Sequence, residues 1–193
     1  MKKRVFIIHG WGGSPNNDWI PWAKSQIENM ECNVIAPQMP DTDNPQVKSW
    51  MDKLKQLVGQ TKKRDILIGH SIGCQTIWRF LEKLPKDQKV DKVIMIAPWL
   101  KLTNLENKEA YTIAAPWLET PIDFAKVKSK ANSFVAIFSD NDQFVPILEN
   151  KIMIEKLLAP KIIVLNKKGH FTGEDGVKEL PEVLNHLDFH ASC

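Results

Sequence analysis

The sequence is poor in the features that mark secreted, membrane-spanning and metal-binding proteins. It has only three cysteines, Cys32, Cys74 and Cys193, too few for a disulfide framework and typical of a reducing compartment. No apolar run approaches the roughly 20 residues of a membrane-spanning helix, and the run after the basic residues 2–4 is too short for a signal peptide. No set of His, Cys, Asp and Glu has the spacing of a metal site. We therefore expect a cytoplasmic protein without a bound metal.

A strong charge of one sign is also missing. The 26 Lys and Arg residues nearly balance the 23 Asp and Glu residues, for a net charge of +3. Nucleic-acid-binding domains are usually much more basic, so we interpret the basic cluster at residues 62–64 as a solvated loop. We expect no nucleic-acid or membrane partner, and the sequence does not indicate any particular protein partner. Repeats and linkers are absent as well, which predicts a single domain over residues 1–193.

What the sequence does contain is a regular alternation of apolar and amphipathic segments. Runs rich in Val and Ile alternate with segments of helical spacing, a pattern typical of parallel strands buried between helices. This pattern predicts an α/β fold in which about six parallel strands carry helices on both faces, with the functional site at their carboxyl ends. The predicted strands lie near residues 5–8, 34–36, 66–68, 93–97, 134–138 and 162–165, and the predicted helices near residues 19–30, 46–58, 74–84, 147–158 and 177–187.

The motif GHSIG at residues 69–73 has the form of a nucleophile elbow. The apolar run at residues 66–68 leads into it, and a segment with helical spacing leads out. A serine in such a strand-to-helix turn projects its hydroxyl above the sheet, and glycines two positions before and after it allow close packing. The helix that follows directs its free N–H groups toward the same point. Ser71 is therefore the candidate nucleophile.

A serine nucleophile needs a base and an acid, which in this arrangement follow it in the order Asp or Glu, then His. Residues 139–146 form an acidic loop after one predicted strand, and His170 follows the next predicted strand. The imidazole would accept the serine proton, while a carboxylate would fix its tautomer and stabilise the imidazolium. Three elements in this order, each after a predicted strand, indicate a catalytic triad.

The identity of the acid is less tightly defined by the sequence. Asp140 and Asp142 both lie in the acidic loop, and Glu174 and Asp175 follow the histidine. We favour Asp142, because Pro146 ends its loop and opens the next helix, which would hold the aspartate firmly. Asp140 has an ordinary role available in a turn or cap.

An oxyanion hole would complete the site. In sites built on a nucleophile elbow, one backbone N–H comes from the loop after the first strand and another from the residue after the nucleophile. Here those donors would be Trp11, in the glycine-rich segment 9–14, and Ile72. We interpret His9 and His70 as packing or bracing residues rather than as the base.

Taken together, these residues resemble the YdeN-like small serine hydrolases, which are related to the retinoblastoma-binding-protein-nine hydrolases. The resemblance implies an α/β-hydrolase fold, a triad of Ser71, Asp142 and His170, and a short chain with little or no cap domain. It covers nearly the whole chain and rests on His9-Gly10 and on segments 19–22, 39–41, 69–74, 142–146, 169–171 and 174–176.

Seven tryptophans are more than this length usually carries. Trp50 and Trp78 fall on predicted helices, and we expect them in the core. Trp22, Trp99 and Trp117 lie in segments that we expect to border the site, and they are our candidates for an apolar substrate pocket. Trp117 belongs to the connection from about residue 98 to residue 130, which is long enough to form a small lid.

The predicted chemistry is two-step acyl transfer to water. We expect hydrolysis of small carboxylic esters without a cofactor, and amides and thioesters remain open alternatives. An acyltransferase or a narrow aminopeptidase could use the same triad. A binding protein that keeps the hydrolase scaffold without catalysis is the alternative from another class, because a fold does not fix a function.

Overall fold

The computed structural model describes residues 2–187, so Cys193 lies outside the described residues. Six parallel strands form one sheet in the order β2-β1-β3-β4-β5-β6. Each strand coincides with one of the apolar runs, which confirms the predicted parallel sheet. The strands are β1 (Arg4–Ile8), β2 (Asn33–Ile35), β3 (Ile66–His70), β4 (Val90–Ile96), β5 (Ala131–Ser139) and β6 (Lys161–Leu165).

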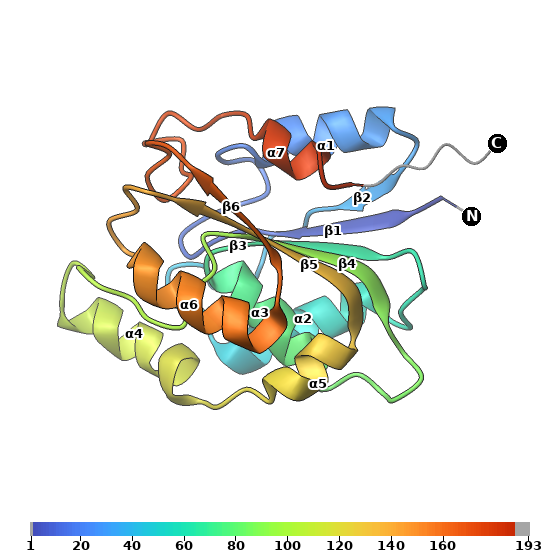
Figure 1. Cartoon of the computed structure of the whole chain (residues 1–193), viewed down its shortest axis with the longest axis horizontal. Coiled ribbons are helices and arrows are strands. Elements are labelled where there is room, and N and C mark those ends of the chain that lie inside the picture. The colour runs from blue at the N-terminus through green and yellow to red at the C-terminus, as the bar shows by residue number, and fades with distance from the viewer. Residues whose placement is uncertain (1, 188–193) are drawn as a thin grey trace.

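Helices cover both faces of the sheet (Figure 1). One face carries α1 (Ile20–Asn29) and α7 (Pro181–Leu184), and the other carries α2 (Val47–Val58), α3 (Ile72–Glu82), α5 (Phe124–Ser129) and α6 (Ile147–Leu158). The last helix is far shorter than the predicted segment 177–187. It begins at Pro181, which favours a first-turn position because it has no N–H to donate.

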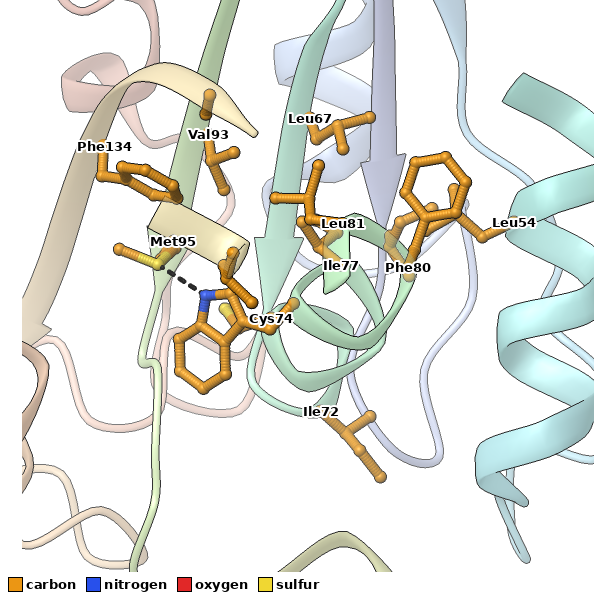
Figure 2. Packing of buried hydrophobic residues seen from close by; sticks show 14 of the residues in the cluster. Leu54, Leu67, Ile72, Cys74, Ile77, Phe80, Leu81, Val93, Met95 and Phe134 are labelled. Atoms are coloured by element: carbon orange, nitrogen blue, oxygen red, sulfur yellow. Dashed lines mark hydrogen bonds between the residues drawn. The ribbon is translucent and has the colours of Figure 1, made fainter. Parts of the chain in front are cut away.

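The alternation of side chains along the strands divides the core into two layers. On β1, Phe6 and Ile8 pack toward α2 and α3, while Val5 and Ile7 pack toward α1, as the period of two requires. Figure 2 shows the first layer, where buried side chains of α3 lie against those of β3 and β4. The core positions predicted for Trp50 and Trp78 are confirmed, since both are fully buried.

The strand order creates a switch point between β1 and β3. The chain leaves β1 for β2 on one side, and β3 lies on the other side of β1. In open parallel sheets, ligands bind in the crevice outside the carboxyl ends of such strands. The loop after β1 and the elbow after β3 therefore lie side by side. A Cβ atom at Gly73 would approach Ile8 O to 2.3 Å, so only glycine allows α3 to begin this close to β1.

The connection between β4 and β5 contains two helices, α4 (Lys108–Glu119) and α5. Asn107 caps α4 by accepting a hydrogen bond from Ala110 N at 2.9 Å. At the other end of α4, the buried Arg79 of α3 donates to Trp117 O at 2.8 Å and to Thr120 O at 3.0 Å. The carboxyl-terminal end of α4 is therefore attached to α3.

Candidate active site

Ser71 occupies the turn between β3 and α3 with a left-handed backbone conformation, at φ +52°. A residue with a Cβ atom rarely adopts this conformation, and it persists only where the surroundings impose it. The surroundings here are tight, since a Cβ atom at Gly69 would lie 2.7 Å from Cys74 N. Ser71 N donates to Ile96 O at 2.8 Å. The elbow thus fixes the serine between the ends of β3 and β4.

His170 and Asp142 extend a hydrogen-bonded series from the serine. His170 Nε2 lies 2.9 Å from Ser71 Oγ, and His170 Nδ1 lies 2.8 Å from Asp142 Oδ2. The other carboxylate oxygen of Asp142 accepts from the backbone N–H groups of Phe144 at 2.9 Å and Val145 at 3.1 Å. Both carboxylate oxygens are therefore engaged, and the side chain of Asp142 is only 3% exposed.

The neighbouring acids accept hydrogen bonds from backbone N–H and hydroxyl groups of the loops and do not contact the imidazole ring. Asp140 Oδ1 accepts from Lys167 N at 2.7 Å, which links the loop after β5 to the loop after β6. Asp175 Oδ2 accepts from His170 N at 2.8 Å and from the Thr172 hydroxyl at 2.7 Å. The structure thus places Asp142, and not Asp140 or Asp175, against the ring of His170.

Asn141 is a positioning residue that sequence reasoning missed. Its Oδ1 accepts from Gly169 N at 2.9 Å and from the Ser139 hydroxyl at 2.8 Å, and Ser139 Oγ in turn accepts from Lys168 N at 2.9 Å. These bonds fasten the segment before His170 to the end of β5. The short polar run after a strand is the only signal in the local sequence, and the Gly169 partner of Asn141 lies 28 residues further along the chain.

His70 contacts both the backbone and the ring of His170. Its Nε2 donates to the backbone O of His170 at 2.8 Å, and its ring lies beside that of His170, with the centroids 5.3 Å apart. Burial is the main reason that the pKa of His70 falls to about 3. The ring is consequently neutral near pH 7, in agreement with a bracing role.

His9 supports the loop on the opposite side of Ser71. Its Nδ1 donates to Gly10 O at 2.7 Å, and its Nε2 accepts from Met39 N at 3.0 Å. This pairing requires a neutral ring with the proton on Nδ1, and burial also lowers the pKa of His9. The loop after β1 is thereby held to the segment that follows β2.

Trp11 and Ile72 both line a cavity of about 410 Å³ together with Ser71 and His170. Ile72 is the first residue of α3, and N–H groups in the first turn of a helix have no partner within it. The side chain of Trp11 is fixed by its own bond, from Nε1 to Asp43 O at 2.9 Å. The two predicted backbone donors thus belong to residues that line the same cavity.

The cavity has an apolar wall, but only one of the three predicted pocket tryptophans belongs to it. Trp99 lines the cavity together with Leu102, Leu105, Ile113 and Phe144.

Trp22 and Trp117 do not line the cavity. Trp117 is 1% exposed, and its Nε1 donates to Pro45 O at 2.8 Å within the core. Trp22 packs against the hydrophobic layer that contains α1. Both expectations failed because nearness to a functional loop in sequence does not determine which way a large side chain is buried.

Carboxylates are the other notable component of the lining. Asp18, Asp43, Glu106 and Glu109 border the cavity, and within residues 2–187 no Lys or Arg does so. Asp18 is half-buried and accepts from Gly173 N at 2.7 Å, while burial raises its pKa. The sequence did not predict this grouping, because Asp18 and Asp43 come from two separate loops and Glu106 and Glu109 from the start of α4.

Comparison with known proteins shows the family of this chain. The sequence pattern of the serine hydrolase family matches residues 5–189. The chain belongs to the serine hydrolase family. It is 28% identical to the hydrolase YdeN of Bacillus subtilis (strain 168) over 190 residues, which cover 97% of this chain and 95% of YdeN. It is 24% identical to the serine hydrolase RBBP9 of Rattus norvegicus over 163 residues, covering 84% of this chain and 78% of RBBP9.

The family fold is also shown by solved structures. The crystal structure of the ydeN gene product from B. subtilis superposes with a TM-score of 0.84 at 26% identity, covering 96% of this chain and 97% of that chain. The resemblance to YdeN-like hydrolases and the α/β-hydrolase fold are therefore confirmed. Between residues 2 and 187, no helix has both the length and the apolar character needed to cross a bilayer.

Proposed function

We propose that this serine hydrolase cleaves small carboxylic esters through an acyl-enzyme intermediate on Ser71. The observation that carries the proposal is the unbroken series Asp142–His170–Ser71, with distances of 2.8 and 2.9 Å, at the wall of a cavity. A purely binding protein has no need for a nucleophile, a base and an acid in this arrangement.

In the acylation step, Ser71 Oγ attacks the ester carbonyl carbon while its proton moves to His170 Nε2. The carbonyl electron pair moves onto the oxygen, and the backbone N–H groups of Trp11 and Ile72 stabilise this oxyanion. Asp142 stabilises the imidazolium that forms. His170 then protonates the alcohol oxygen as the carbon–oxygen bond breaks, leaving the acyl group on Ser71.

In the deacylation step, His170 takes a proton from a water molecule that attacks the acyl carbon. The second tetrahedral intermediate collapses, the bond from carbon to Ser71 Oγ breaks, and His170 returns a proton to Oγ. The released products are a carboxylic acid and the free enzyme. An acyltransferase would use the same steps with another alcohol or amine in place of water, and the rates with and without added acceptors distinguish the two.

The residues that line the cavity favour a particular class of substrate. The wall that contains Trp99, Leu102 and Ile113 suits an apolar acyl group. The four carboxylates and the lack of a facing Lys or Arg within the described lining disfavour an acyl group that carries its own negative charge. We propose uncharged or cationic acyl groups of modest size as substrates.

The test is turnover of p-nitrophenyl acetate and butanoate by the wild type and by Ser71→Ala. We expect the variant to lose at least about 10³-fold in kcat, because removal of a triad member leaves only binding and the oxyanion donors. Ser25→Ala, at an exposed position on α1, is the matched control and should retain wild-type rates. Equal activity of Ser71→Ala and the wild type would contradict the proposal.

A further inference from the structure

The nucleophile has a second side-chain partner that the triad does not include. Trp99 Nε1 lies 3.2 Å from Ser71 Oγ, and both side chains are buried. An indole N–H can only donate a hydrogen bond, so the serine oxygen accepts from Trp99. The serine hydroxyl hydrogen is thereby left for His170 Nε2, which lies 2.9 Å away.

Two buried amide side chains hold the segment that carries the indole. Gln75, from α3, donates to Trp99 O at 2.8 Å. Asn150, from α6, accepts from Leu100 N at 2.6 Å and from Lys101 N at 2.9 Å. Gln75 and Asn150 are 1% and 0% exposed, so the residues around Trp99 are fixed from two helices.

A residue with a positive φ also precedes the indole, as one does at the elbow. Ala97 directly follows β4 and has φ +46°, in the left-handed region. Its N–H donates to Ile137 O at 2.9 Å, which keeps it attached to the end of β5. Non-glycine residues in this region gather at functional sites, where the surroundings impose them. The turn at Ala97 lets the following segment place Trp99 over the elbow.

Three other buried tryptophans direct their indole N–H groups to partners away from the site. The indole N–H groups of Trp50 and Trp117 donate to backbone carbonyls at 2.7 and 2.8 Å, and that of Trp78 donates to the Met95 sulfur at 3.2 Å. Those bonds satisfy a buried donor within the core. Only the Trp99 donor, among these four rings, meets an atom that forms and breaks bonds in the proposed reaction.

We propose that Trp99 is a catalytic residue whose indole N–H stabilises negative charge on Ser71 Oγ. The proposal rests on the acyl-enzyme mechanism given above. In acylation, charge develops on Oγ as its proton moves to His170 Nε2 and the bond from Oγ to carbon forms. In deacylation, that bond breaks, its electron pair returns to Oγ, and the proton from His170 follows. A fixed donor aimed at Oγ lowers the energy of both transition states without reorganisation.

This role differs from that of a wall residue in a way that kinetics can measure. A wall contacts the acyl chain, so its loss harms long acyl groups more than short ones and acts mainly through KM. A donor to Oγ acts on every substrate, because each one passes through the same charge on the same atom. The effect of removing the N–H should therefore be independent of acyl length and should be seen in kcat.

The test compares Trp99→Phe with Trp78→Phe, using p-nitrophenyl acetate and hexanoate. Both substitutions make the same chemical change in a fully buried ring of the same core layer, but the Trp78 donor points to sulfur. We expect Trp99→Phe to lower kcat roughly ten- to hundredfold with both esters, as for a hydrogen bond to a charged group. Trp78→Phe should stay within about threefold of the wild type.

Single-turnover measurements and an isosteric replacement complete the test. Release of acetate from the acetyl-enzyme should slow by a similar factor in Trp99→Phe. Replacing Trp99 with 3-benzothienylalanine keeps the ring shape, removes only the N–H, and should reproduce the loss. Any one of three outcomes would overturn the proposal: full activity of the benzothienyl protein, a loss confined to hexanoate, or equal losses in Trp78→Phe. A Ser71→Ala protein that keeps turning over esters would instead refute the acyl-enzyme mechanism itself.

Discussion

The loops that carry Asp142 and His170 differ sharply from the α4 segment across the cavity in how firmly they are held. The two loops are linked by side-chain to backbone bonds at residues 167, 168 and 169 in succession, and Asp175 holds His170 N from within the second loop itself. The α4 segment is attached by Arg79 at its carboxyl-terminal end, while residues 106–109 at its start are exposed. The first region therefore suits chemistry, which needs fixed distances, and the second suits selection of the acyl group.

The largest loss of activity should come from a substitution of the triad acid, in the firmly held region. Asp142→Asn keeps the size of the side chain but removes its charge and allows the wrong histidine tautomer. We expect kcat on p-nitrophenyl acetate to fall by about 10³- to 10⁴-fold. Asp140→Asn, the matched control in the same loop, should lose less than about tenfold, because Asp140 contacts only a backbone N–H. A larger loss in Asp140→Asn would mean that the acid has been wrongly identified.

An intermediate effect should appear in the pH dependence of stability through His70. Its pKa lies at about 3 in the folded protein, below the ordinary value of 6.5. The unfolded chain therefore binds the extra proton between these values, so stability falls as pH falls from about 6.5 toward 3. His70→Gln keeps a donor near the position of Nε2 but cannot titrate in this range.

Urea unfolding at several pH values measures this contribution directly. The free energy of unfolding of the wild type should lose up to about 1.4 kcal/mol per pH unit more than that of His70→Gln below pH 6. The difference between the two proteins removes the contribution of the shared carboxylates. Parallel curves for the two proteins over this range would show that His70 is not held neutral by the fold.

The smallest effect should come from the exposed start of α4. Replacing Glu106 and Glu109 with Gln removes two negative charges from the cavity mouth. We expect kcat/KM for an ester with a carboxylate on its acyl chain, such as a p-nitrophenyl hemisuccinate, to rise about two- to fivefold at low salt. The rate on the uncharged butanoate ester should not change. A rise of equal size with both esters would show that the charges do not select the substrate.

The sequence predicted most accurately what depends on neighbours in the chain. The six strands follow from runs of Val and Ile, and the conformation of Ser71 follows from the glycines at 69 and 73. The preference for Asp142 rested on its loop, and its Oδ1 does accept from Phe144 N and Val145 N in that loop. Periodicity and turn chemistry carry this information because they act over a few residues.

Features that depend on contacts between distant segments could not be predicted from local sequence patterns. The burial of Trp117 follows from its bond to Pro45 O, 72 residues away. The bond from Trp99 to Ser71 joins the ends of two different strands. Helix α4 contains Pro116, which is unusual inside a helix, and the length of the connection from 98 to 130 predicted only a segment that could form a lid.

The most direct test of the central claim is intact-mass analysis after labelling with a fluorophosphonate probe, on the wild type and Ser71→Ala in parallel. An activated serine attacks phosphorus as it attacks a carbonyl carbon, so the probe reports the assembled Ser71–His170–Asp142 series without any knowledge of the substrate. The predicted result is one adduct per wild-type chain and none on Ser71→Ala. A folded wild type that takes up no probe, or an adduct that persists in Ser71→Ala, would contradict the claim that Ser71 is the activated nucleophile.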